Sequence, residues 1–483
     1  MSENLNSKIK SATKWSAITE LIAKLLTPIV SIVLARLLTP EAFGVVTTLT
    51  MIITFAEIFT DAGFQKYLVQ HEFVDSKDRK ESTDVAFWSN LIMSLLIWAC
   101  IAIFASPLAA LVGNPGLGHV LIIACASIPL AAFSSIQMAL YKRDFDFKTL
   151  FKVRMVGVFM PLFVTIPLAF FLRSYWALVI GTLAVNTSNA ILLTMYSTWK
   201  PSLYFSFLKL KEMLSFTIWS MIEQISIWLT SYVDVFIVGT MLSQYYLGLY
   251  KTSSALVGQL MGLITAVTTP ILFSALSRLQ EDEKSFTEMF YRFQKIVGLL
   301  VIPLGTGVFL FSDFITSILL GDQWMEASGF IGLWALTSAV TIVLSHYASE
   351  VYRAKGKPKL SVLAQVLHII VLWPTVLIAV KYGFETLYIS RSLIRFELIL
   401  VNLVILKLLI KISPLYMIKN ILPSCAAALL MCIVFYLIGS TDTLFSTLIS
   451  IVICALAYIL GICVFKNERE LLFNLNKLIK TKE

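Results

Sequence analysis

The first candidates for a functional site are the charged residues inside long apolar stretches. Arg391 and Arg395 lie one helical turn apart within residues 384–409, and no acidic residue lies three or four positions from both. Charged side chains in hydrocarbon cost at least about 2.5–3.5 kcal/mol each, so two guanidiniums there require an anion or water. Because guanidinium binds phosphate groups bidentately, the pair predicts a site for an anion such as a diphosphate. The alternative is pairing with a distant carboxylate.

Two further clusters carry polar groups into the predicted membrane core. Glu20 and Lys24 are four residues apart, a spacing that allows an ion pair on one helical face, and Lys24 adds a third positive charge. Gln224 stands 204 residues after Glu20, so we include Lys24, Glu20 and Gln224 among the predicted substrate-binding residues. Glu223 and Asp61 are candidates for coupling to an ion, and the alternative for Glu223 is a permanent structural ion pair.

Motifs for covalent chemistry are absent from the sequence. It contains no GxxxxGK[ST] phosphate loop, no HExxH pair and no GxSxG nucleophile motif. Asp144-Phe145-Asp146 matches the DxD pair of some glycosyltransferases, but it lies in a short basic loop without a nucleotide-binding domain. All six cysteines fall in apolar stretches without metal-ligand spacing. We therefore predict a protein that is not an enzyme and has neither a cofactor nor a metal site.

The elements that position these residues are membrane-spanning helices. Hydrophobic residues make up 58% of the 483 residues and charged residues 14%, far from the roughly 45–50% and 25% of soluble domains. Apolar stretches of this length must cross lipid as helices, because lipid offers backbone amides no partner. The prediction is an all-α membrane protein with about fourteen spans: 15–37, 43–65, 85–111, 117–140, 153–172, 175–198, 213–242, 247–276, 296–320, 328–352, 361–380, 384–409, 417–438 and 444–465.

The basic residues predict the orientation of these spans. If the N-terminus is cytoplasmic, 31 of the 38 Lys and Arg residues lie on the cytoplasmic side and only four on the other. This distribution follows the positive-inside rule and accounts for the net charge of +9 without nucleic acid. Both termini are therefore predicted to be cytoplasmic. Residues 1–14 form a cytoplasmic segment, and residues 466–483 form an amphipathic tail on the inner leaflet.

An internal repeat appears when the chain is compared with itself at offsets of 204–211 residues. Leu38-Thr39-Pro40-Glu41-Ala42-Phe43-Gly44 aligns with Leu242-Ser243-Gln244-Tyr245-Tyr246-Leu247-Gly248, and Tyr141-Lys142-Arg143 aligns with Tyr352-Arg353-Ala354. The repeat predicts two parallel six-helix lobes, residues 15–199 and 213–410, followed by a two-helix extension over 417–465. Parallel repeats of this kind typically enclose a central transport site, although a duplication without a transport role would leave the same pattern.

Several segments resemble a known family. The stretch 34–46 (LARLLTPEAFGVV), the segment from Asp61-Ala62-Gly63 to Gln70, residues 233–250, Leu320-Gly321-Asp322-Gln323-Trp324 and the basic loop 353–359 are similar to polysaccharide transporters. The similarity is closest to the Wzx-type lipopolysaccharide-biosynthesis flippases of the multidrug/oligosaccharidyl-lipid/polysaccharide exporter superfamily. It covers nearly the whole chain, but its motifs are diffuse.

This resemblance implies a function and its partners. The expected substrate is an undecaprenyl-diphosphate-linked oligosaccharide, moved by alternating access from the inner to the outer leaflet of the cytoplasmic membrane. The expected partners are this lipid-linked substrate, membrane lipid and the polysaccharide polymerase and chain-length machinery, with no nucleic acid. One alternative is a cation-coupled drug exporter of the same superfamily. Another is an oligosaccharide polymerase or ligase, which would favour a large outer loop that the sequence lacks.

Overall fold

The computed structural model describes the backbone of residues 2–61, 63–439 and 443–473. Side chains are described in these ranges except at 2–10, 61, 215–220, 222, 223 and 471–473. The chain divides into two compact units, Met1–Lys251 and Thr252–Glu483. The division falls after the seventh predicted span, because that helix packs on helices of the first unit.

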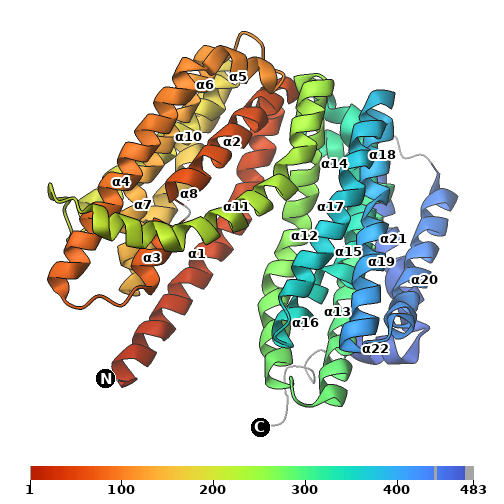
Figure 1. The fold of residues 1–483 in the computed structure, drawn as a ribbon. Helices are drawn as coiled ribbons and strands as arrows, with labels where there is room; N and C mark the ends of the chain where they lie inside the picture. Colours follow the sequence, from red (N-terminus) through yellow and green to blue (C-terminus); the bar gives the residue numbers. More distant parts are fainter. Residues whose placement is uncertain (1, 62, 440–442, 474–483) are drawn as a thin grey trace. The chain divides into compact units, whose positions relative to one another are not determined.

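The first unit is built from helices of very different lengths (Figure 1). In this unit α4 packs on α7, α7 on α10, α10 on α8 and α8 on α1, while α11 packs on α2. Its helices are α1 (Ser2–Leu37), α2 (Pro40–Asp61), α3 (Phe64–Gln70), α4 (Ser76–Ile103), α5 (Ala105–Leu111), α6 (Gly118–Cys125), α7 (Ser127–Arg143), α8 (Phe147–Met160), α9 (Ile166–Leu172), α10 (Trp176–Tyr196), α11 (Phe207–Met241) and the first turns of α12 (Gln244–Arg278).

The second unit is organised around α13, which contacts α15, α20 and α21. The two helices of the predicted C-terminal extension, α20 and α21, therefore pack on this unit. Beyond the rest of α12, its elements are α13 (Glu283–Leu310), α14 (Ser312–Leu319), α15 (Ser328–Thr341), a π-helical turn (Ile342–His346), α16 (Ala348–Ala354), α17 (Lys359–Ala379), α18 (Phe384–Leu393), α19 (Arg395–Ile405), α20 (Pro414–Ile438), α21 (Leu444–Cys463) and α22 (Lys466–Phe473).

Several predicted spans are interrupted, and proline explains three of the breaks. Pro107 and Pro129 have no amide hydrogen for the carbonyls of Ile103 and Cys125, where α4 and α6 end. Pro161 begins a π-helical turn over Pro161–Thr165 between α8 and α9. The helices over the predicted spans 85–111, 117–140 and 153–172 are therefore interrupted, while Ser76–Ile103, Gly118–Arg143 and Phe147–Leu172 are each long and apolar enough to span a membrane. The predicted end of the second span at residue 65 was wrong, because α2 ends at Asp61 and α3 begins at Phe64.

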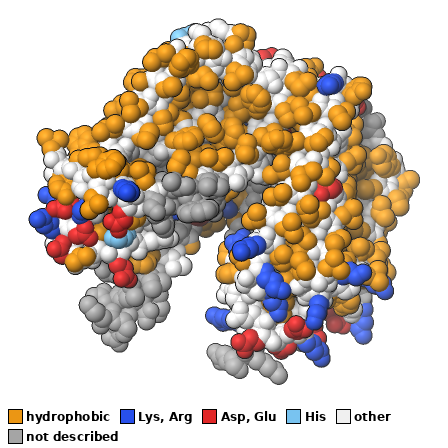
Figure 2. All heavy atoms as spheres, in the orientation of Figure 1, with side chains coloured by type: hydrophobic (Ala, Val, Ile, Leu, Met, Phe, Trp, Pro, Cys, Tyr) orange, Lys and Arg blue, Asp and Glu red, His pale blue; other side chains and the backbone are white. Residues whose placement is uncertain are grey.

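The described helices are suited to a membrane. Among the described residues, thirteen helices are long and apolar enough to span one. The expected span 384–409 is helical, but it is divided at Ile394 and carries several charged residues. Large apolar side chains such as Phe163, Phe171 and Leu437 are exposed, as lipid-facing residues should be. Figure 2 shows hydrophobic side chains over most of the visible face of each unit and charged ones mainly near one end. The predicted all-α, multi-pass membrane fold is confirmed.

A close crossing joins the starts of α2 and α12, and its two glycines are partners in the internal repeat. A Cβ added at Gly44 would lie 2.7 Å from the carbonyl carbon of Gln244. A Cβ added at Gly248 would lie 2.6 Å from that of Pro40. The Gln244 side chain also donates to the Gly113 carbonyl at 2.9 Å. The helix starts can approach this closely only because both positions lack a side chain.

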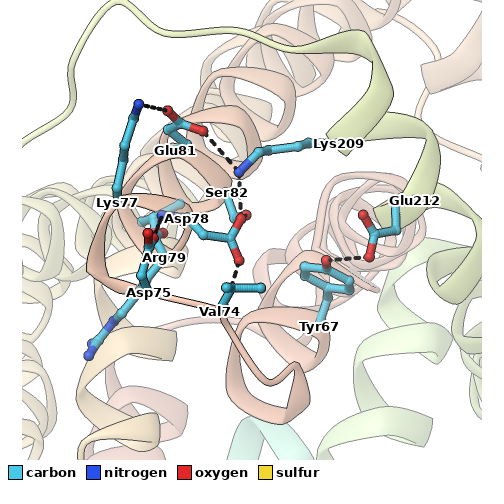
Figure 3. A network of polar contacts seen from close by, with 11 residues as sticks. Tyr67, Val74, Asp75, Lys77, Asp78, Arg79, Glu81, Ser82, Lys209 and Glu212 are labelled. Atoms are coloured by element: carbon cyan, nitrogen blue, oxygen red, sulfur yellow. Dashed lines mark hydrogen bonds and ion pairs between the residues drawn. The ribbon is translucent and has the colours of Figure 1, made fainter.

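A polar network fixes the start of α11 on α3 and α4 (Figure 3). Lys209 Nζ lies 2.6 Å from Asp78 Oδ1 and 3.1 Å from Glu81 Oε2. The Tyr67 hydroxyl donates to Glu212 Oε1 at 3.2 Å. Burial disfavours the charged form of Lys209, but its hydrogen bonds with Asp78 and Glu81 outweigh this effect and raise its pKa. Lys209 therefore stays charged and ties α11 to α4.

Candidate functional site

The first unit contains a polar pocket of about 600 Å³, which we call the first-unit pocket. Residues of α2, α3, α7, α10 and α11 line it, so it lies among helices that are otherwise apolar. This volume falls in the range of about 300–1,000 Å³ that is typical of small-ligand sites. The polar lining comprises Thr54, Glu57, Thr60, Gln65, Lys66, Ser134, Ser135, Lys142, Asn186, Asn189 and Gln224.

Three side-chain amides in the first-unit pocket have no hydrogen-bond partner among the described residues. Among the described residues, none forms a hydrogen bond with the side chain of Asn186, Asn189 or Gln224. Asn186 and Asn189 are three residues apart on α10, so both reach the same face of that helix. Each amide has two donors and an acceptor, and desolvating them unpaired is costly. These groups are available to water or to a polar ligand.

The second unit contains its own polar pocket, of about 340 Å³, which we call the second-unit pocket. It is lined by α12, by the segment from α15 to α16, by α17 and by α19. Hydroxyl groups dominate the lining, and Arg395 contributes a positive charge. The polar lining comprises Thr265, Ser338, Thr341, Ser345, His346, Ser349, Tyr352, Ser361, Gln365, Arg395 and Asn402.

The two predicted arginines share an aromatic partner. The guanidinium carbon of Arg395 lies 3.3 Å from the centroid of the Trp334 ring, and that of Arg391 lies 5.1 Å from it. Arg395 also donates to the Ser338 hydroxyl and, at 3.5 Å, to the Trp334 carbonyl. Cation–π contacts with Trp334 therefore contribute to stabilising both charges. Arg395 lines the second-unit pocket, whereas Arg391 is not among its lining residues.

A buried histidine and a carboxylate lie next to this region. His368 Nδ1 is 2.7 Å from Glu397 Oε2, which joins α17 to α19. Both residues lie within predicted spans. Glu397, a carboxylate close in sequence to the two arginines, therefore forms a short contact with His368.

The two pockets are built from equivalent positions of the internal repeat. The sequence repeat aligns at offsets of 204 and 211 residues. Adding one of these offsets to the number of a residue that lines the first-unit pocket often gives a residue that lines the second-unit pocket. These pairs are Thr54 with Gly258, Ile58 with Gly262, Ala131 with Ile342, Ser134 with Ser345, Ser135 with His346 and Met138 with Ser349. Asn186 and Arg395 are related by an intermediate offset of 209 residues. The pockets thus support the repeat independently of the sequence similarity.

The structure places the predicted site residues in different surroundings. Gln224 lines the first-unit pocket and Arg395 the second-unit pocket. Glu20 and Lys24 are both exposed on α1, and within the described side chains no ion pair joins them. The side chains of Glu223 and Asp61 lie outside the described residues.

The acidic residues of the DxD match have structural roles. Asp144 Oδ2 accepts a hydrogen bond from Arg79 at 2.7 Å. Asp146 caps the start of α8 by accepting from the Thr149 amide at 3.1 Å. The match therefore reflects an ion pair and a helix cap.

Sequence reasoning missed the amides of α10 and the aromatic partner of the arginines. Asn186 and Asn189 left a usable signal, because two asparagines three residues apart are unusual in an apolar span. Trp334 left none, because it precedes the arginines by more than fifty residues on another helix. Together, the pockets offer hydrogen bonds and positive charge to a polar ligand among apolar helices.

Solved structures share this fold. A lipid II flippase MurJ in an inward closed conformation has a TM-score of 0.74 at 16% sequence identity, covering 94% of this chain and 98% of that one. An inward-facing multidrug resistance transporter of the MATE family has a TM-score of 0.58 at 15% identity, covering 81% and 96%. The chain therefore shares the fold of these two membrane proteins.

The family follows from sequence comparison. The profile described as "Polysaccharide biosynthesis protein" matches residues 33–329, which is more than half of the chain. The chain therefore belongs to the polysaccharide biosynthesis protein family, and the predicted resemblance is confirmed. Relatives include an uncharacterized membrane protein in the cps region of Klebsiella pneumoniae, 21% identical and covering 77% of this chain and 76% of the relative. Another is the lipopolysaccharide biosynthesis protein WzxC of Escherichia coli (strain K12), 21% identical and covering 66% and 65%.

Proposed function

We propose that this protein flips undecaprenyl-diphosphate-linked oligosaccharide repeat units from the cytoplasmic to the outer leaflet of the bacterial cytoplasmic membrane, by alternating access, for surface polysaccharide biosynthesis. Family membership supports the pathway, and the fold shared with a lipid II flippase supports the kind of transport. The names of relatives such as the succinoglycan biosynthesis transport protein ExoT of Rhizobium meliloti (strain 1021) agree with it.

The observation that carries this proposal is a guanidinium in the wall of a polar pocket among apolar helices. The second-unit pocket holds Arg395 beside many hydroxyl groups. The diphosphate and sugars of a lipid-linked oligosaccharide are polar and must cross the hydrocarbon core of the membrane. Its polyprenyl chain is apolar and is stable within that core. Arg395 is held by Trp334 and Ser338, so its charge is oriented before a ligand arrives. A preoriented guanidinium can bind a diphosphate without first losing rotamer freedom.

The other predicted residues have supporting roles in this proposal. Arg391 and Lys24 add positive charge for the diphosphate, and Glu20 and Gln224 offer hydrogen bonds. Glu223 and Asp61 are proposed as coupling residues on the sequence argument alone. The polysaccharide polymerase and chain-length machinery are proposed as partners that receive the product.

The test is polymer export in a strain whose own flippase gene is deleted. Replacing Arg395 by alanine should abolish export while the amount of protein in the membrane, measured by immunoblot, stays unchanged. Arg395→Lys should restore export only in part, because an ammonium cannot reproduce the bidentate contact. Full export by the Arg391→Ala, Arg395→Ala double variant would reject the anion site.

A cation-coupled exporter of small drugs is the second candidate, favoured by the fold shared with a MATE transporter. It predicts that the protein raises the resistance of a drug-sensitive strain to cationic compounds and does not restore polymer export. Arg395 in the second-unit pocket opposes this candidate, because a guanidinium repels a cationic ligand.

A further inference from the structure

The first-unit pocket differs in chemistry from its repeat counterpart. The second-unit pocket has Arg395, whereas the related position of the first-unit pocket has Asn186. Asn189 and Gln224 add two more neutral amides to the same pocket. The first-unit pocket thus has three neutral amides beside Glu57, Lys66 and Lys142, whereas the second-unit pocket has a guanidinium among hydroxyl groups.

We infer that the first-unit pocket is a binding site for the sugar hydroxyl groups of the substrate, with Asn186, Asn189 and Gln224 as the recognising side chains. This inference rests on the proposed function and concerns the sugar part of the substrate. The sugars are assigned to the amides of the first unit.

The hydrogen-bonding capacity of the three amides carries the inference. No described protein group satisfies these side chains, and each offers two donors and an acceptor. A sugar hydroxyl is at once a donor and an acceptor, so it is complementary to both ends of an amide. The amides come from α10 and α11, so two helices would contact the ligand.

The charged residues of the pocket come from α2, α3 and α7, whereas the two asparagines come from α10. Lys142 is in the last turn of α7, where its ammonium lies 3.4 Å from Gln65 Oε1, and Lys66 is on the short helix α3. Asn186 and Asn189 lie in the middle of α10. Glu57 also lines the pocket and provides a negative charge that disfavours a diphosphate. The three amides add uncharged hydrogen-bonding groups to this lining, and such groups are complementary to neutral hydroxyls.

The experiment compares two lipids on the full-length protein in nanodiscs. The first is undecaprenyl diphosphate, which has no sugar. The second is the lipid-linked oligosaccharide extracted from the strain whose polymer export the protein restores. Native mass spectrometry gives a dissociation constant for each lipid with the parent and with an Asn186→Ala, Asn189→Ala double variant. Thr187→Ala is the matched control, because Thr187 is exposed between the two asparagines and does not line the pocket.

The parent should bind the oligosaccharide form more tightly than the bare lipid. The double variant should lose about tenfold of its affinity for the oligosaccharide form, as expected for two lost hydrogen bonds, and keep its affinity for undecaprenyl diphosphate. Its unchanged binding of the bare lipid also shows that it is folded. The Gln224→Ala variant should show the same selective loss, and Thr187→Ala should behave as the parent.

Three results would overturn the inference. The double variant could bind both lipids as the parent does, it could weaken both equally, or the parent could fail to distinguish them. A different result would contradict the proposed function itself: the parent protein would bind neither lipid and would not restore polymer export. That result would remove the function and the sugar site together.

Discussion

The crossing of α2 and α12 gives a stability prediction with a size set by the structure. The Cβ of a Gly44→Ala variant would lie 2.7 Å from the carbonyl carbon of Gln244, and that of Gly248→Ala 2.6 Å from that of Pro40. Carbon atoms in contact are about 3.5–4.0 Å apart, so each variant must separate the helix starts by about 1 Å. Overpacking of this kind costs about 1–3 kcal/mol.

Two other glycines of α12 provide matched controls for this prediction. A Cβ at Gly258 or Gly262 would meet nothing within 4 Å. Alanine there should be neutral or stabilising by about 0.5–1 kcal/mol, since alanine is the better helix former. Apparent melting temperatures of the purified variants in one detergent should fall for Gly44→Ala and Gly248→Ala and not for the controls. The reasoning about the crossing fails if all four variants melt at or above the parent temperature.

Two further predictions concern orientation and the start of α11. Cysteines introduced at Gly116 and Ser174 of a cysteine-free variant should react with a membrane-impermeant maleimide in intact spheroplasts, and labelling at Ser76 and Lys357 instead would reverse the predicted orientation. Lys209→Ala should speed trypsin cleavage at Lys211, because it removes contacts of 2.6 Å and 3.1 Å between α11 and two carboxylates of α4. Lys77→Ala is the control, since Lys77 is 82% exposed and lies 3.8 Å from Glu81, and equal cleavage of both variants would contradict the role of Lys209.

The membrane fold could be predicted from the sequence because lipid imposes a strong requirement on composition. Every spanning backbone must be helical and its outer face apolar, so the apolar stretches located the spans. The interruptions depend on single residues within those stretches. Pro107 and Pro129 are visible in the sequence, and treating each as a missing amide donor would have predicted the ends of α4 and α6.

The candidate site was predicted only where one residue was conspicuous by itself. Arg395 and Gln224 are polar residues in apolar stretches, and both line pockets. The spacing of Glu20 and Lys24 permits an ion pair, but exposed pairs gain little, and the structure leaves these side chains apart. The contact of both arginines with Trp334 could not be predicted, because it arises from packing between distant segments.

The chemistry of the two pockets also bears on the choice between the candidate functions. At an offset of 209 residues, within the range of the sequence repeat, Asn186 of the first-unit pocket corresponds to Arg395 of the second-unit pocket. A cationic drug would gain nothing from Arg395 and would leave the amides of Asn186 and Asn189 without hydroxyl partners. Neutral hydroxyl groups are complementary to the amides of the first-unit pocket, and an anionic group is complementary to Arg395 of the second-unit pocket. The chemistry of these side chains therefore favours a lipid-linked oligosaccharide over a drug as the transported molecule.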